Sequence, residues 1–139
     1  MRGLDGIIRL RKWQLDEVRR ALADLEKMRA DLIADLDQLA NEVDREQTVA
    51  ADDPATANYG AYARGVIDRR DTLRRSIAEV DQAIKAKRDE VTEAFRELKK
   101  YEIAAARAHE RDMLAAGRRE QAEGDEVGLQ IYRRRGRGG

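Results

Sequence analysis

Apolar residues recur in a regular pattern along the first third of the chain. From Leu4 to Val43 the steps between them alternate between three and four positions, with basic residues filling two of the places. Written as heptads, the a and d positions are Leu4, Ile8, Arg11, Leu15, Val18, Leu22, Leu25, Arg29, Leu32, Leu36, Leu39 and Val43. A repeat of about 3.5 residues kept over this length predicts a coiled-coil helix with a narrow apolar seam, which one or two partner helices can cover.

The same spacing returns in the middle of the chain. Its a and d positions are Tyr59, Ala63, Val66, Arg70, Leu73, Ile77, Val80, Ile84, Lys87, Val91, Ala94, Leu98, Tyr101, Ala105 and Ala108, with Tyr62 and Phe95 beside them. The two patterns are separated by a segment that holds the only proline of the chain, two aspartates and an asparagine. This composition is typical of a loop, and a short connection between long helices favours antiparallel neighbours.

The sequence therefore predicts an all-α fold of two long helices that form an antiparallel coiled-coil hairpin over residues 1–124. We expect a helix over about residues 6–50, a loop over about 51–57 and a helix over about 58–120. Residues 125–139 are rich in glycine and arginine and are predicted to be disordered. Because each seam can cover the other without the entropy loss of association, we expect a monomer.

The expected helix ends rest on capping residues. Asp5 is a suitable N-cap for the first helix, and either Asp53, which precedes the proline, or Asn58 is suitable for the second. Gly117 marks the expected end of the second helix, with a weaker continuation to Gly124.

Composition narrows the class of protein further. Charged residues make up 40% of the chain and aromatic residues 4%, and the formal net charge is zero. This profile is typical of long helices, and it does not indicate strong attraction to nucleic acid or anionic lipid. There is no cysteine, no long apolar run and no apolar segment of the signal-peptide type at the N-terminus. A cytoplasmic location is the expectation.

Residues for catalysis are sparse. The single histidine, His109, lies among alanine, arginine and glutamate residues, as a solvent-exposed helical histidine does. Carboxylates alternate with basic residues on the outer helix faces, so they are interpreted as surface ion pairs. We therefore expect no enzymatic activity, no cofactor and no metal site.

Several residues depart from the coiled-coil pattern. Arg11, Arg29, Arg70 and Lys87 occupy seam positions. Either their long side chains extend to the edge of the seam, or they select the register between the helices. Trp13, the only tryptophan, lies opposite the seam at an f position.

The aromatic residues and the tail have structural and functional interpretations. Trp13 is a candidate partner contact, or it packs against the longer second helix. Tyr59 and Tyr62 either close the tip of the hairpin or form a second recognition surface. The four arginines of residues 133–137 suggest contact with RNA or lipid only weakly, so no nucleic-acid partner is expected.

Taken together, these segments resemble the FliJ family of flagellar export proteins. The resemblance is carried by the block Leu4-x-x-Ile-Ile-x-Leu-Arg-Lys-Trp-Gln-Leu-Asp-Glu, by Arg20-Ala-Leu-Ala-Asp-Leu-Glu, by the helix break followed by Tyr59-x-x-Tyr62, and by Lys99-Lys-Tyr-Glu. It covers residues 1–120. It implies a coiled-coil stalk of the flagellar type III export apparatus, associated with the inner face of the membrane. A stalk or chaperone-escort protein of a virulence type III secretion system is the alternative.

The resemblance also implies partners. The end with both termini would enter the pore of the hexameric export ATPase, and the hairpin end would face the cytoplasmic domain of the export gate protein. Export chaperones are further partners that the resemblance implies. The residues expected at the ATPase end are Arg9, Arg11, Lys12 and Trp13, and those expected towards the gate are Tyr59, Tyr62 and Leu73.

Overall fold

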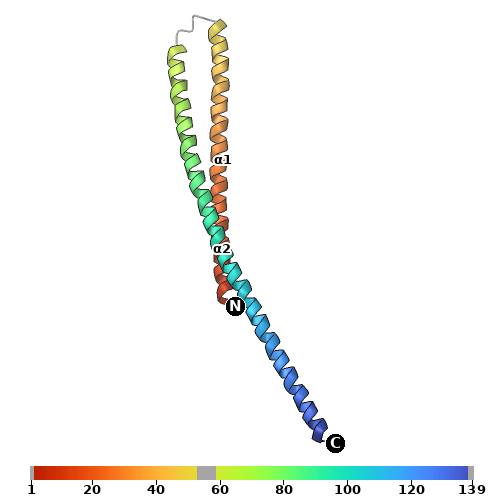
Figure 1. Ribbon diagram of the computed structural model, residues 1–139. Helices are drawn as coiled ribbons and strands as arrows, with labels where there is room; N and C mark the ends of the chain where they lie inside the picture. The colour runs from red at the N-terminus through yellow and green to blue at the C-terminus, as the bar shows by residue number, and fades with distance from the viewer. Residues whose placement is uncertain (1, 53–58, 138–139) are drawn as a thin grey trace. The chain divides into compact units, whose positions relative to one another are not determined.

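The computed structural model describes residues 2–52 and 59–137, and the side chains of residues 3–49 and 60–136. These residues form two α-helices, α1 (Arg2–Asp52) and α2 (Tyr59–Arg137), which Figure 1 shows. The contacts divide the chain into a terminal unit, Met1–Trp13 with Arg96–Gly139, and a central unit, Gln14–Phe95. The predicted all-α fold of two long packed helices is confirmed.

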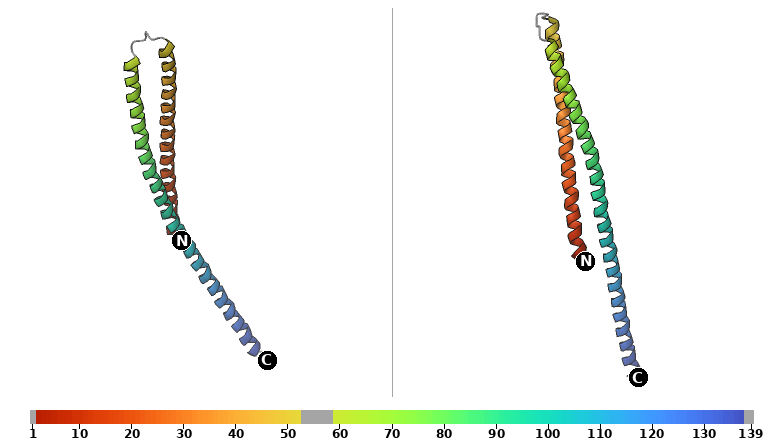
Figure 2. Two further views of the ribbon diagram at one scale, coloured as in Figure 1. Left: turned by 45° about the horizontal axis from the view of Figure 1, so that its top comes forward. Right: turned by 90° about the vertical axis from the view of Figure 1, so that its left-hand side faces the viewer.

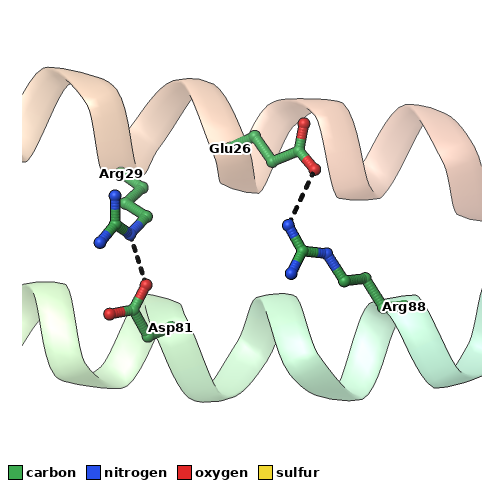
Figure 3. A network of polar contacts seen from close by, with 4 residues as sticks. All are labelled: Glu26, Arg29, Asp81 and Arg88. Atoms are coloured by element: carbon green, nitrogen blue, oxygen red, sulfur yellow. Dashed lines mark hydrogen bonds and ion pairs between the residues drawn. The ribbon is translucent and has the colours of Figure 1, made fainter.

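In the central unit, α1 and α2 run side by side and antiparallel, as Figures 1 and 2 show. Ion pairs between the helices fix the direction. Glu26 pairs with Arg88, and further along α1 Glu42 pairs with Arg69, so numbers rise on one helix as they fall on the other. Between these two pairs, Arg29 of α1 reaches Asp81 of α2 (Figure 3).

The least exposed side chains lie on the two predicted seams. Every buried apolar residue of the described part is an a or d position: Leu15, Leu39, Val80, Ile84, Leu98 and Ala108. The other seam residues with described side chains are half-buried, because a seam between only two helices borders water along both edges. Burying one leucine or isoleucine side chain contributes about 1.5–3 kcal/mol. The hairpin is therefore stabilised by a single line of such contacts.

The first helix begins earlier than its expected N-cap. Asp5 lies inside the first turn of α1, which starts at Arg2. Leu4 is a seam position and is half-buried, so the helix must include it to complete the contact. In the first turn, the carboxylate of Asp5 still interacts favourably with the positive end of the helix dipole. The last turns of α1 extend to Asp52, two residues into the expected loop.

The second helix continues beyond both glycines that were expected to end it. α2 reaches Arg137, so Gly117, Gly124 and most of the tail expected to be disordered are helical. A glycine ends a helix by adopting a positive φ, and no described glycine does so. The residues around them are mainly alanine, glutamate, glutamine and arginine, which favour helix strongly enough to offset about 1 kcal/mol per glycine.

The caps proposed for the second helix, Asp53 and Asn58, lie outside the described residues. α2 is first described at Tyr59.

Candidate functional site

The residues expected to contact an ATPase all belong to the terminal unit. Arg9, Lys12 and Trp13 are exposed on α1, and 60% of the surface of Trp13 is accessible. The predicted outward position of the tryptophan is therefore found in the structure.

Leu10 lies on the same outer surface as Trp13. It is 50% exposed and stands three positions before the tryptophan, a spacing that places two side chains next to each other on a helix. We call Leu10 and Trp13, with Arg9 and Lys12 beside them, the Trp13 patch. An apolar pair with basic neighbours has the composition that partner-binding surfaces favour. Sequence reasoning missed Leu10, although an apolar residue at an outer heptad position was a usable signal.

Arg11 differs from its neighbours because it faces inward. Its side chain is half-buried, and its guanidinium carbon lies 5.4 Å from the centre of the Tyr101 ring on α2. Lys100 Nζ lies 5.7 Å from the same ring. A cation over an aromatic face is attracted by the negative charge of the ring face. Arg11 therefore joins α1 to α2 inside the terminal unit.

The residues expected towards the gate lie at the start of α2. Tyr62 is half-buried and lines a shallow groove with Leu39, Glu42, Val66 and Arg69. Leu73 is a half-buried seam residue. The side chain of Tyr59 lies outside the described residues.

Cross-helix ion pairs surround a second groove of the central unit. Arg29 Nε lies 2.5 Å from Asp81 Oδ1, and Arg88 Nη2 lies 3.8 Å from Glu26 Oε1 (Figure 3). All four side chains are between 42% and 66% exposed, so water screens these charges. The groove is lined by both ion pairs and by Ile84, Lys85 and Asp89. The two ion pairs join α1 to α2, so they favour the register in which these residues face each other.

In the described part of the chain, the side chains that could hold a metal ion are those of histidine, aspartate and glutamate. His109 is exposed, as expected, and no group of three or more histidine, aspartate or glutamate side chains is placed to hold a metal ion among residues 2–52 and 59–137. No described helix has a stretch that is long and apolar enough to cross a lipid bilayer.

These features define a class: a two-helix antiparallel coiled coil with charged outer faces and small exposed apolar patches. Comparison with protein families then gives the family. The model of the family described as the flagellar FliJ protein matches residues 1–137, and the chain belongs to this family. It is thus a component of flagellar type III protein export. No curated protein and no solved structure matches the chain.

Proposed function

We propose that the chain is the stalk that links the hexameric flagellar export ATPase to the cytoplasmic domain of the export gate protein. Membership of the flagellar FliJ family over residues 1–137 is the observation that carries the proposal. In this role the chain itself performs no chemistry. The ATPase supplies the energy, and the gate holds the stalk at the inner face of the membrane.

The physical properties of the helices suit such a role. An α-helix is about 10–12 Å across with its side chains, so a pair of helices is narrow enough for the central pore of a protein ring. The heptad positions outside the seams are occupied mainly by charged residues of both signs, which keep the pair of helices hydrated. This charge pattern favours contacts that can be remade as subunits of a ring change state.

The Trp13 patch is the proposed contact with the ATPase. Trp13 and Leu10 supply apolar area, and the positive charges of Arg9 and Lys12 favour an acidic partner surface. Tryptophans in such positions are often the residues whose loss costs about 2 kcal/mol or more of binding free energy. Truncating Trp13 should therefore weaken the complex about 30-fold.

Tyr62 and the groove beside it are the proposed contact with the gate. Because Leu73 belongs to the seam and is half-buried, its contribution there is mainly to position the start of α2. Export chaperones are proposed as further partners of the outer faces. The flagellar family favours this apparatus over a virulence secretion system.

Binding of the purified chain to the purified export ATPase tests the proposal. The unmodified chain should be retained by immobilised ATPase, Trp13→Ala should be retained weakly, and Met28→Ala should bind normally. Met28 is a matched control because it is a large apolar residue of α1 that is 50% exposed in the central unit. If the unmodified chain does not bind, the proposal is wrong.

The proposed gate contact is tested separately. Tyr62→Ala should reduce binding to the cytoplasmic domain of the gate protein and leave binding to the ATPase unchanged. Trp13→Ala should have the opposite pattern. If each variant weakened binding to the ATPase and to the gate domain equally, the assignment of the two surfaces would be wrong even though both complexes form.

A further inference from the structure

The C-terminal part of α2 is a helix without a partner in the described part of the chain. Every described side chain from His109 to Gly136 is exposed. Several of them are large and apolar: Met113, Leu114, Val127, Leu129, Ile131 and Tyr132, each between 47% and 75% exposed. Helices gain most of their stability from packing an apolar face, so a helix of this kind is a candidate for intermolecular packing.

Charge along this helix is ordered into blocks. An acidic block contains Glu120, Glu123, Asp125 and Glu126, and a basic block contains Arg133, Arg134, Arg135 and Arg137. Between them lies an apolar middle of Val127, Leu129 and Ile131. Acidic residues also form a run in α1, at Asp31, Asp35, Asp37, Glu42 and Asp44, but there α2 lies alongside and Glu42 pairs with Arg69. In the C-terminal part of α2, an acidic and a basic block follow each other on a segment whose described side chains are all exposed.

We propose that this segment binds the same segment of a second copy of the chain, antiparallel and centred near Leu129. The acidic and basic blocks lie at similar distances on either side of Leu129, so a two-fold axis there places each acidic block against the basic block of the partner. Val127 and Ile131, four residues apart on one helix face, come level with Ile131 and Val127 of the other copy.

Charge excludes the competing arrangements of two copies. A parallel pair would place acidic on acidic and basic on basic residues along its whole length. An antiparallel pair centred near Glu123 would place the acidic block against itself. Like charges directly opposite each other are destabilising, so only the arrangement centred near Leu129 is favoured at both ends.

Two glycines leave room for a second helix to approach the backbone of this segment closely. Gly124 and Gly128 lie on the same face as Ile131, and nothing in the described structure lies within 4 Å of a Cβ placed on either glycine. A second helix therefore meets no side chain at these two positions.

The acidic block also disfavours a nucleic-acid occupant. The basic block alone suits phosphate groups, but the acidic block ends at Glu126, only seven residues before Arg133, and its carboxylates would repel a phosphate backbone that followed the helix. A second copy uses both blocks, which is why the observations favour it.

The expected association is weak. The overlap of about 18 residues is about 27 Å long, so the contact is smaller than a standard stable interface. Screening of the exposed charges should also make it salt-sensitive. The monomer that the two seams predict is therefore expected at low protein concentration. At higher concentration the C-terminal segment, which neither seam covers, allows two copies to associate.

Sedimentation velocity of the full chain, over a range of concentrations and at low salt, tests the proposal. The native chain should show a reversible monomer–dimer equilibrium. Replacing all four residues of the acidic block with lysine, or all four residues of the basic block with glutamate, should raise the dissociation constant about tenfold or more. Reversing both blocks in one chain should restore association, because the two-fold complementarity returns. Circular dichroism verifies that each variant keeps its helices.

A matched control reverses charges outside the proposed contact. Glu110→Lys with Asp112→Lys should leave the dissociation constant unchanged. A native chain that is monomeric at every concentration, or a doubly reversed chain that stays monomeric, would overturn the proposal. Binding of an RNA oligonucleotide by the native chain, in place of self-association, would also overturn it.

Orientation can be measured independently because the chain has no cysteine. A spin label on Arg118→Cys lies about 11 residues from the proposed centre, so an antiparallel pair separates the two labels by about 33 Å along the helix axis. A parallel pair would bring them to about 10 Å, the distance between packed helices. The short distance would refute the proposed arrangement.

Discussion

Exchanging the charges of Arg29 and Asp81 tests the register between the helices of the central unit. Arg29 is a seam residue of α1, and its Nε lies 2.5 Å from Asp81 Oδ1 on α2 (Figure 3). The two residues are far apart in sequence, so they attract each other only when the hairpin is folded in this register. Arg29→Asp, Asp81→Arg and the double exchange form a complete thermodynamic cycle.

The size of the effect follows from the exposure of the pair. The side chains of Arg29 and Asp81 are 42% and 46% exposed, so the native attraction contributes only about 0.2–1 kcal/mol after screening. Each single reversal replaces this attraction with a repulsion of similar size. Arg29→Asp also removes the arginine stem from the seam. We expect each single variant to lose about 1–2 kcal/mol, and the double variant to be about 1 kcal/mol more stable than the sum of the single effects.

Urea unfolding followed by helical circular dichroism measures these free energies. A local control exchanges Glu17 and Arg20, which pair at 2.9 Å within α1. Its coupling should be small, about 0.5 kcal/mol or less, and independent of how α2 is placed. If the Arg29–Asp81 cycle were strictly additive, the two side chains would not face each other, and the register described for the central unit would be wrong.

Three further experiments have defined outcomes, measured by the same unfolding assay or by amide hydrogen exchange. Ile84→Ala should lose about 2–3 kcal/mol because the side chain is 5% exposed, whereas Ile67→Ala, at 46% exposure, should lose less than about 0.5 kcal/mol. Gly117→Ala should slow exchange in the C-terminal part of α2 by about two- to fivefold, because a helical glycine costs about 0.5–1 kcal/mol and an added Cβ meets nothing within 4 Å. Arg11→Gln and Tyr101→Leu should be coupled by about 0.5–1 kcal/mol, and full additivity would argue against the cation–π contact.

The seams could be predicted because their period is a property of the sequence alone. Every a and d position with a described side chain, from Leu4 to Ala108, is buried or half-buried. Apolar periodicity identifies which face of a helix is covered, and the break between the two patterns locates the turn region. The outward position of Trp13 follows from the same heptad frame.

The C-terminal end of α2 could not be predicted in this way, because the apolar period shows which face of a helix is covered and not where the helix ends. Gly117 and Gly124 were interpreted as stop signals, but a glycine ends a helix only when the following chain offers a competing conformation. Arginine is abundant near Arg137, and its helix preference is close to that of leucine. A composition associated with disorder is therefore also compatible with a charged helix.

The basic residues of the seams show why the contacts between the two helices could be identified only from the structure. Lys87 pairs with Glu90 at 2.7 Å, and Arg70 Nε lies 3.9 Å from Asp71, so both reach along their own helix to the edge of the seam. Arg29 instead pairs with the opposite helix of the central unit. All three residues occupy seam positions, a for Arg29 and Arg70 and d for Lys87, and the sequence did not show which of them would pair across the hairpin. The three basic residues differ in the residue that lies opposite each of them on the other helix. That residue depends on the register, and a repeat of 3.5 residues defines the register only up to a shift by whole heptads. Arg29 and Asp81 favour one shift over the others, and their charge exchange is therefore the most direct measurement of it.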